Sequence, residues 1–98
     1  MKGTVTLIVP CYNEEESLPI FYHAVCDVAK NLPDYELTLL LVNDGSKDGT
    51  LRIMRSLAAK DEHVKYLSFS RNFGKEAAMY AGFCNAKGDY VAVMDADM

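Results

Sequence analysis

The sequence predicts a single α/β domain built on a parallel β-sheet. Four strand-like segments alternate with three helix-like segments along 98 residues. Parallel neighbours need a crossover connection, and a helix is the usual crossover. The strand-like segments are almost continuously apolar, which is typical of a sheet covered on both faces. Half of the residues are hydrophobic, enough for one packed core at this length.

The first part of the chain predicts a strand, a helix and a second strand. Residues 4–9 form an apolar run that ends at a polar cluster, residues 10–14. Residues 17–31 place apolar side chains at three- and four-residue intervals, the spacing of a helix that buries one face. Pro33 ends that helix because proline cannot continue its hydrogen-bonded ladder. Residues 35–42 then form the second strand.

A second helix and a third strand follow. Residues 48–61 repeat the helical spacing, and Ser46 or Asp48 is available as the N-cap of this helix. Residues 64–70 carry the pattern of the third strand. We therefore expect this helix to cross over between the second and third strands.

The third helix is expected over residues 73–86, with small residues on its inward face. Glycine inside a helix costs about 1 kcal/mol relative to alanine, so Gly82 indicates a close approach to the sheet. Residues 90–94 form the fourth strand. Right-handed crossovers predict a Rossmann-like strand order of 3-2-1-4, with three layers and helices on both faces. Ligands of such sheets bind beyond the carboxyl ends of the strands, where strands 1 and 4 meet.

The fourth strand ends at two carboxylates one residue apart, Asp95 and Asp97. Mg²⁺ takes oxygen ligands and is usually held by one or two carboxylates, with substrate phosphates completing its shell. Taken alone, such a pair more often decorates a solvated turn. The second strand also ends near an acid, Asp44, and the first ends at residues 10–14. The sequence therefore predicts that acids converge on one sheet edge as a metal and phosphate site.

Three motifs in this order resemble the family 2 glycosyltransferases of the GT-A fold: residues 9–15, residues 42–50 and residues 95–97. The run Ser-Arg-Asn-Phe-Gly-Lys-Glu-Ala-Ala at residues 70–78 resembles the branch that contains dolichol-phosphate mannosyltransferases and bacterial polyprenyl-phosphate glycosyltransferases. The resemblance implies inverting transfer of a sugar from a nucleoside diphosphate donor. It also implies Mg²⁺ or Mn²⁺ as cofactor and a polyprenyl-phosphate or glycan acceptor.

The same resemblance implies roles for individual residues. Asp44 would accept a hydrogen bond from the base, a role that suits an ionised carboxylate because it only accepts. Asp95 would lie near the ribose and diphosphate, and Asp97 would bind the metal, with Asp95 as a second ligand. No catalytic residue is implied within this stretch. The implied nucleotide-sugar-binding residues are Pro10, Tyr12, Glu14, Val42, Asp44, Lys75, Asp95 and Ala96.

Structural roles remain open for several of these positions. Asp44 precedes a glycine and fits a turn, since both residue types tolerate turn dihedrals. Glu14, Glu15 and Glu16 all fit a helix N-terminus, where the macrodipole favours acids, and for Glu15 and Glu16 we prefer this role. Arg71 and Lys75 flank the start of the third helix, where they would either receive phosphate or remain solvated.

The histidines and cysteines do not predict a site. His23 and His63 have no partner at metal-ligand spacing, so we expect core or surface roles for both. Cys11, Cys26 and Cys84 are odd in number and contain no Cys-x-x-Cys pair. This pattern argues against a disulfide scaffold or a zinc site, and we expect reduced and mostly buried thiols.

Charge and hydropathy exclude several classes of protein. A formal net charge of -4 argues against nucleic-acid binding, which needs clustered basic residues. No stretch approaches the ~20 apolar residues of a membrane span. We expect a cytoplasmic location, at the cytoplasmic face of a membrane in a longer protein. Residues 1–98 are expected to form one nucleotide-sugar-binding domain that is truncated after the Asp-x-Asp motif, with self-association through an exposed fourth strand.

Two other functions fit part of the pattern. An Mg²⁺-dependent aspartate phosphoacceptor domain also groups acids at the carboxyl ends of parallel strands. That arrangement expects acids after the first and third strands, whereas here they follow the second and fourth. A non-catalytic nucleotide-binding or interaction module would use the donor site without turnover.

Overall fold

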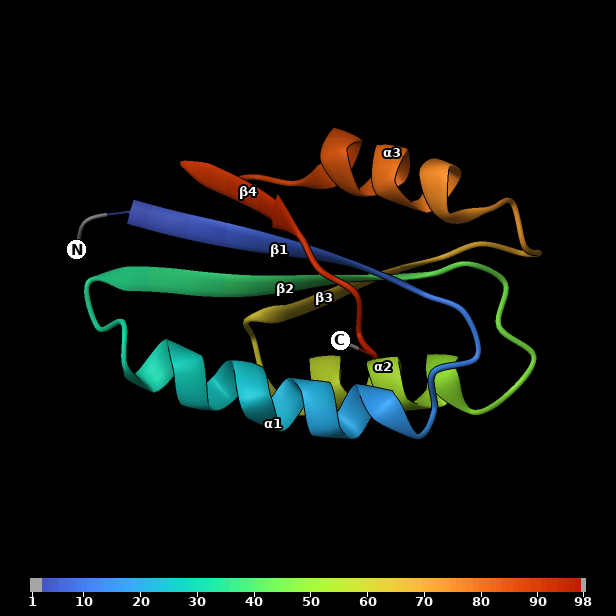
Figure 1. Ribbon diagram of the computed structural model, residues 1–98, viewed down its shortest axis with the longest axis horizontal. Coiled ribbons are helices and arrows are strands. Elements are labelled where there is room, and N and C mark those ends of the chain that lie inside the picture. Colours follow the sequence, from blue (N-terminus) through green and yellow to red (C-terminus); the bar gives the residue numbers. More distant parts are fainter. Residues whose placement is uncertain (1–2, 98) are drawn as a thin grey trace.

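Residues 3–97 are described by a computed structural model and form a four-stranded parallel sheet between two helical layers (Figure 1). The strand order β3-β2-β1-β4 confirms the predicted order. Figure 1 shows α1 and α2 on one face and α3 on the other. Within residues 3–97, no helix has the length and apolar character needed to cross a bilayer. The elements are β1 (Gly3–Cys11), α1 (Ser17–Lys30), β2 (Tyr35–Asn43), α2 (Thr50–Lys60), β3 (Val64–Ser68), α3 (Lys75–Asn85) and β4 (Tyr90–Val93).

Some element boundaries differ from the sequence prediction. β3 ends at Ser68 and α3 begins at Lys75, so residues 69–74 form a longer connection than expected. Gly49, and neither Ser46 nor Asp48, is the N-cap of α2. The Asp48 carboxylate still accepts a hydrogen bond from the backbone N–H at the first position of α2, at 2.9 Å. The acid therefore satisfies one helix-terminal donor from outside the cap position.

The two faces of the sheet carry two separate apolar clusters. On the face covered by α1 and α2, the cluster includes Val9 from β1 and Phe21 from α1. On the opposite face, Ile8 of β1 packs with Leu40 of β2 and Ala78 of α3. Adjacent residues of one strand thus point to opposite faces, as pleating requires. Burial on both faces explains why the central strands are apolar without alternation.

The small residues of α3 allow this helix to approach β1 closely. A Cβ atom added at Gly82 would lie 2.4 Å from Cγ2 of Ile8. Ala78, one turn earlier, is fully buried in the same contact. The structure confirms the predicted close approach of Gly82 to the sheet.

The three cysteines are free, but they are not all buried. Cys11 is buried at the end of β1 and Cys26 is half-buried on α1. Cys84 is exposed on α3, which corrects the expectation of mostly buried thiols. Cys84 lies on the face of α3 that is turned from the sheet, since Ala78 and Gly82 occupy the inner face.

Strand β4 forms one edge of the sheet and pairs with β1 through residues 90–93. Tyr90 and Val91 are exposed on this strand. Exposed apolar edges favour pairing with another chain. Self-association through β4 therefore stays a prediction.

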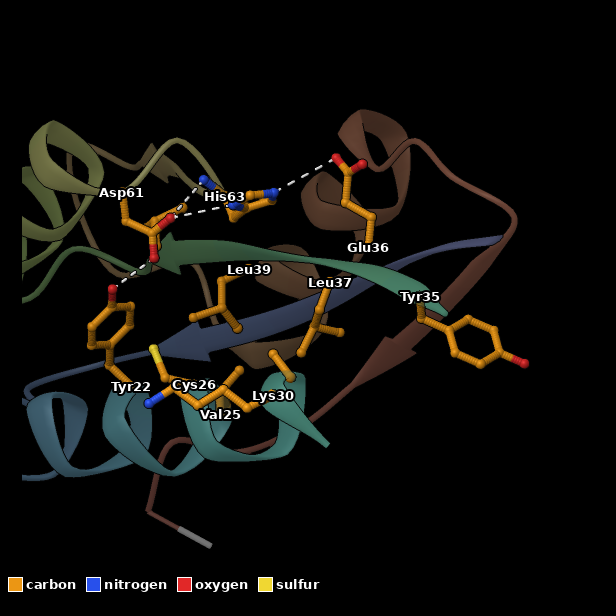
Figure 2. A pocket seen from close by; sticks show the side chains of 12 residues that line it. Tyr22, Val25, Cys26, Lys30, Tyr35, Glu36, Leu37, Leu39, Asp61 and His63 are labelled. Atoms are coloured by element: carbon orange, nitrogen blue, oxygen red, sulfur yellow. Dashed lines mark hydrogen bonds and ion pairs between the residues drawn. The ribbon is translucent and has the colours of Figure 1, made fainter. Parts of the chain in front are cut away.

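A cavity of about 470 Å³ lies between α1, the first residues of β2 and the turn before β3 (Figure 2). The Tyr22 hydroxyl donates to Asp61 at 2.6 Å, and the backbone N–H of His63 donates to the same carboxylate at 2.9 Å. The His63 ring lies between Asp61 and Glu36, with nitrogen–oxygen distances of 3.5 and 3.8 Å. His63 thus has a structural role at this turn, and His23 is exposed on α1.

We expect Tyr22→Phe to lower the free energy of unfolding by about 1 kcal/mol at pH 7, the range of a single hydrogen bond. The hydrogen bond from Tyr22, followed by the one from the His63 backbone, lowers the pKa of Asp61 below its ordinary value. A lowered folded-state pKa contributes stability above the unfolded-state pKa, and this stability is lost as the pH falls through the folded-state value.

Urea unfolding at pH 7 and in the acidic range, below the ordinary aspartate pKa of about 4, measures this effect. The difference between the wild type and Tyr22→Phe should shrink on acidification. Tyr66→Phe, at an exposed tyrosine of β3, is the matched control. A Tyr22→Phe difference that is the same at both pH values would contradict the prediction.

Candidate functional site

A second cavity, of about 210 Å³, opens at the carboxyl ends of the strands. All of its lining residues except Cys11 are predicted site residues, although they come from four separate parts of the chain. The larger cavity of Figure 2 lies at the opposite end of β2, at residues 35–39, and contains none of the predicted residues. The lining residues of the smaller cavity are Pro10, Cys11, Tyr12, Glu14, Asp44, Lys75, Asp95 and Asp97.

Two predicted site residues do not line this cavity. Val42 is fully buried among the side chains between the sheet and α3. Ala96 is buried in the cluster on the α1 and α2 face. Burial of Ala96 anchors the segment that carries Asp95 and Asp97, because these two residues are its neighbours in the chain. The two apolar side chains therefore pack in the cores beside the cavity and do not line it.

The loop after β1 is tied to the loop after β2. The Asn13 backbone N–H donates to Ser46 Oγ at 2.9 Å, and Asn13 Oδ1 accepts from the Lys47 N–H at 2.8 Å. The Glu14 N–H donates to Thr50 Oγ1 at 2.8 Å. Asn13 has a φ of 54°, a left-handed conformation in which asparagine is enriched. Asn13 positions the adjacent Tyr12, whose side chain is 42% exposed at the rim of the cavity. The sequence analysis did not predict a role for Asn13, and its place in a turn after a strand is the only feature of the sequence that indicates one.

Asp44 is only 4% exposed and is held by the connection before α3. Its carboxylate accepts hydrogen bonds from the backbone N–H groups of Phe73, at 2.8 Å, and Gly74, at 3.1 Å. The side-chain amide of Asn72 donates to it at 3.3 Å. Asp44 therefore does more than shape its own turn, since it joins two distant loops.

Lys75 and Asp95 form an ion pair inside the cavity. Lys75 Nζ lies 2.7 Å from Asp95 Oδ1, and the two side chains are 58% and 52% exposed. The hydrogen bond to Asp95, with a smaller contribution from Asp97, raises the pKa of Lys75 above its ordinary value. A cation and two carboxylates thus share the end of the cavity formed after β4.

The donor atoms at this end suit a hard divalent cation that phosphates help to hold. Within residues 3–97, no group of three or more His, Cys, Asp or Glu side chains is arranged to bind a metal without further ligands. Asp95 and Asp97 supply carboxylate oxygens beside the cavity. One or two carboxylates with phosphate oxygens are the usual protein environment of Mg²⁺. The residues present therefore fit a metal that arrives with a phosphorylated ligand.

The two basic residues before and within α3 have different environments. Lys75 lines the cavity with the acids, whereas Arg71 lines a neighbouring cavity of about 530 Å³. The Arg71 guanidinium lies 4.1 Å from the centre of the Phe73 ring, a cation–π contact. Of these two residues, only Lys75 is placed to meet an anion beside Asp95.

Cys11 lines the cavity but lacks the properties of a nucleophile. Burial, with a smaller contribution from Glu14, raises the pKa of the Cys11 thiol to about 12. The thiolate is the reactive and metal-binding form, so a protonated thiol is inert at neutral pH. Cys11 therefore contributes shape to the cavity.

The fold places this chain in the class of GT-A glycosyltransferase folds. A mannosyltransferase from Pyrobaculum calidifontis, PcManGT, solved with GDP-Man and Mn²⁺, superposes with a TM-score of 0.82 at 26% identity, over 99% of this chain and 28% of that chain. S. aureus TarS in complex with UDP superposes with a TM-score of 0.79 at 26% identity, over 96% of this chain and 27% of that one.

The chain belongs to glycosyl transferase family 2, whose family model matches residues 6–98. It is 47% identical to a prophage bactoprenol glucosyl transferase homolog of Escherichia coli K12 over 94 residues, 96% of this chain. It is 39% identical to an undecaprenyl-phosphate 4-deoxy-4-formamido-L-arabinose transferase of Pseudomonas fluorescens over 95 residues. The chain spans 30% and 28% of the lengths of these two relatives.

We expect Lys75→Met to raise the affinity for Mn²⁺ alone several-fold. The Lys75 ammonium lies 2.7 Å from an Asp95 oxygen, so it competes with any cation for that carboxylate. Titration followed by the electron paramagnetic resonance signal of free Mn²⁺ measures the change, and the gain should diminish at high salt. Lys65→Met, at an exposed position of β3, is the matched control. An unchanged or lower Mn²⁺ affinity in Lys75→Met would contradict the competition.

Proposed function

We propose that this chain is the donor-binding part of an inverting glycosyltransferase. The donor would be a nucleoside diphosphate sugar bound with Mg²⁺ or Mn²⁺, and the acceptor a polyprenyl phosphate. One observation carries the proposal: Lys75, Asp95 and Asp97 share a cavity with Tyr12 and Asp44, although these residues come from separate parts of the chain. Charged groups for a diphosphate and a metal thus lie beside an aromatic ring and a hydrogen-bond acceptor for a nucleoside.

The nucleoside would occupy the part of the cavity near β1 and β2. The partly exposed Tyr12 ring offers a face for the base. Asp44 Oδ1 accepts one hydrogen bond from the described residues, from the Phe73 N–H, and a carboxylate oxygen has two lone pairs. Asp44 therefore retains acceptor capacity for an N–H group of a base.

The diphosphate would lie toward β4. The Lys75 ammonium would pair with phosphate oxygens once it leaves Asp95. Asp95 and Asp97 would hold the metal, with the diphosphate completing its ligand set. When bound, a divalent cation acts as a Lewis acid that stabilises the charge of the departing nucleoside diphosphate.

The names of the relatives support a polyprenyl-phosphate acceptor, since those proteins are described as bactoprenol and undecaprenyl-phosphate transferases. A phosphate oxygen is already anionic, which lessens the need for a general base. Because a polyprenyl chain dissolves in a bilayer, the acceptor phosphate would be met at a membrane surface. We propose the cytoplasmic face, in agreement with the expectation from the sequence.

An aspartate phosphoacceptor function finds no support in this geometry. Such a protein needs a carboxylate that is free to attack a phosphorus atom. Asp44 is almost fully buried and accepts three hydrogen bonds, and Asp95 is paired with Lys75. The cavity therefore favours binding of a diphosphate over transfer to a carboxylate.

We expect Asp97→Asn to lower the affinity for UDP or GDP in Mn²⁺ about tenfold or more, because the metal loses one of its two carboxylate ligands. Calorimetric titration of both nucleotides, with Mn²⁺ and with a chelator, measures the loss. Asp27→Asn, at an exposed position of α1, is the control and should bind as the wild type does.

Equal wild-type affinity in Mn²⁺ and in chelator would overturn the metal site. Metal-dependent donor binding without sugar transfer to any polyprenyl phosphate would favour the non-catalytic module. Lipid-linked sugar formed from a radiolabelled donor, and lost in Asp97→Asn, would support the transferase.

A further inference from the structure

Asp44 directly follows β2, and its carboxylate contacts the segment that leads into α3. It accepts the backbone N–H groups of Phe73 and Gly74, the two residues that precede the first helical residue, Lys75. Gly74 has a φ of 103°, a conformation that residues with a side chain rarely adopt. The direction in which the chain enters α3 is therefore set by a glycine at positive φ and one buried anion.

The backbone of the loop after β2 also touches this segment directly. A Cβ atom added at Gly45 would lie 2.1 Å from the carbonyl carbon of Arg71 and 2.2 Å from the backbone nitrogen of Asn72. Gly45 itself has a φ of 69°. Only glycine permits this contact and this conformation together. Two independent features, a hydrogen-bonded carboxylate and a backbone contact, thus fasten residues 71–74 to the end of β2.

Lys75 follows this segment immediately, and its ammonium lies 2.7 Å from Asp95 Oδ1 in the cavity. We propose that Asp44 is a positioning residue, whose carboxylate holds residues 72–74 and thereby places the Lys75 ammonium beside Asp95, where a ligand's diphosphate would bind. The inference rests on the proposed donor site and adds a role for Asp44 that is separate from contact with a base.

The two roles of Asp44 affect different parts of a ligand. A contact with the base would act on a nucleoside that has no phosphates. The position of Lys75 affects the affinity only for ligands that carry phosphate, because its ammonium binds the negatively charged phosphate oxygens. The Gly74→Ala variant separates the roles, since Gly74 does not line the cavity and an added Cβ meets no atom within 4 Å.

The experiment compares Gly74→Ala, Asp44→Asn and Lys75→Met in the chain, with Gly88→Ala as the control. Gly88 also has a positive φ, of 131°, but it precedes β4 at the opposite end of the sheet from the cavity. We expect Gly74→Ala to lower UDP and GDP affinity in Mn²⁺ about tenfold, the effect of moderate backbone strain. The affinities for uridine and guanosine should not change.

Two further measurements test the route through Lys75. In a Lys75→Met background, Gly74→Ala should change nucleotide affinity less than about twofold, because the positioned group is already gone. In the ligand-free chain, the Lys75 ammonium should lose its contact with Asp95 in Gly74→Ala and in Asp44→Asn, which would change the carbon-13 shifts of Lys75 Cε and of the Asp95 carboxyl carbon at neutral pH. Amide exchange at residues 73 and 74 should become faster in Asp44→Asn.

Unchanged carbon-13 shifts of Lys75 Cε and of the Asp95 carboxyl carbon in both variants would overturn the inference without reference to any ligand. If the losses of nucleotide affinity in Gly74→Ala and in Lys75→Met multiply in the double variant, the inference would also be overturned. If the wild-type chain binds neither UDP nor GDP, the proposed function fails, while the carbon-13 and amide-exchange measurements still decide whether Asp44 positions Lys75. If Asp44→Asn does not fold, Gly74→Ala carries the same measurements.

Discussion

The parallel pairing of β1 with β2 and β4 determines where every polar group of the site lies. The pairing places Cys11 beside Asn43 and Ile8 beside Val93, so three strands end at the same edge of the sheet. Pairing in this register is favoured because Ile8, Val9 and their neighbours are buried on both faces. A slip by one residue would exchange the two apolar clusters and move the acids away from one another.

The loops at this edge depend on hydrogen bonds between distant segments more than on regular structure. Asn13 joins the loop after β1 to the loop after β2, and Asp44 joins the loop after β2 to the segment before α3. Asp44 is buried, where an unmet hydrogen bond costs about 1 to 3 kcal/mol, whereas Asn13 is exposed and its hydrogen bonds cost less to lose. The hydrogen bonds of these two residues shape the rim of the cavity, and those of Asp44 are the more costly to break.

Among the described residues, acids outnumber bases in the cavity, which is lined by Glu14, Asp44, Asp95 and Asp97 with Lys75 as its one cation. Lys75 neutralises Asp95, and the Asp44 carboxylate is compensated by three donors. The ion pair is exposed and therefore weak, so it can exchange Asp95 for another partner. The two backbone N–H groups of Phe73 and Gly74 bind a buried carboxylate, that of Asp44, and the loss of these hydrogen bonds would be costly. The exposed end of the cavity thus suits exchange of ions, while the buried end suits rigid positioning.

The sequence by itself determined the elements, the strand order and the set of acids at the carboxyl edge. Strand and helix periodicity depends on local residue spacing, and right-handed crossovers leave few arrangements for four parallel strands. The convergence of Asp44, Asp95 and Lys75 followed from that topology together with the family motifs.

Only the tertiary structure decided which partner each side chain takes. The Asp44 carboxylate is hydrogen-bonded to residues 28 to 30 positions away in the chain, and no local sequence pattern encodes contacts across such a separation. The same is true of Val42 and Ala96, which the motifs placed in the site and which packing placed in the two cores. Arg71 and Lys75 are similar in charge, and only the direction of the segment before α3 turns one to Phe73 and the other to Asp95. Sequence spacing determines which face of an element a residue occupies, whereas the partner across a gap depends on how the elements pack.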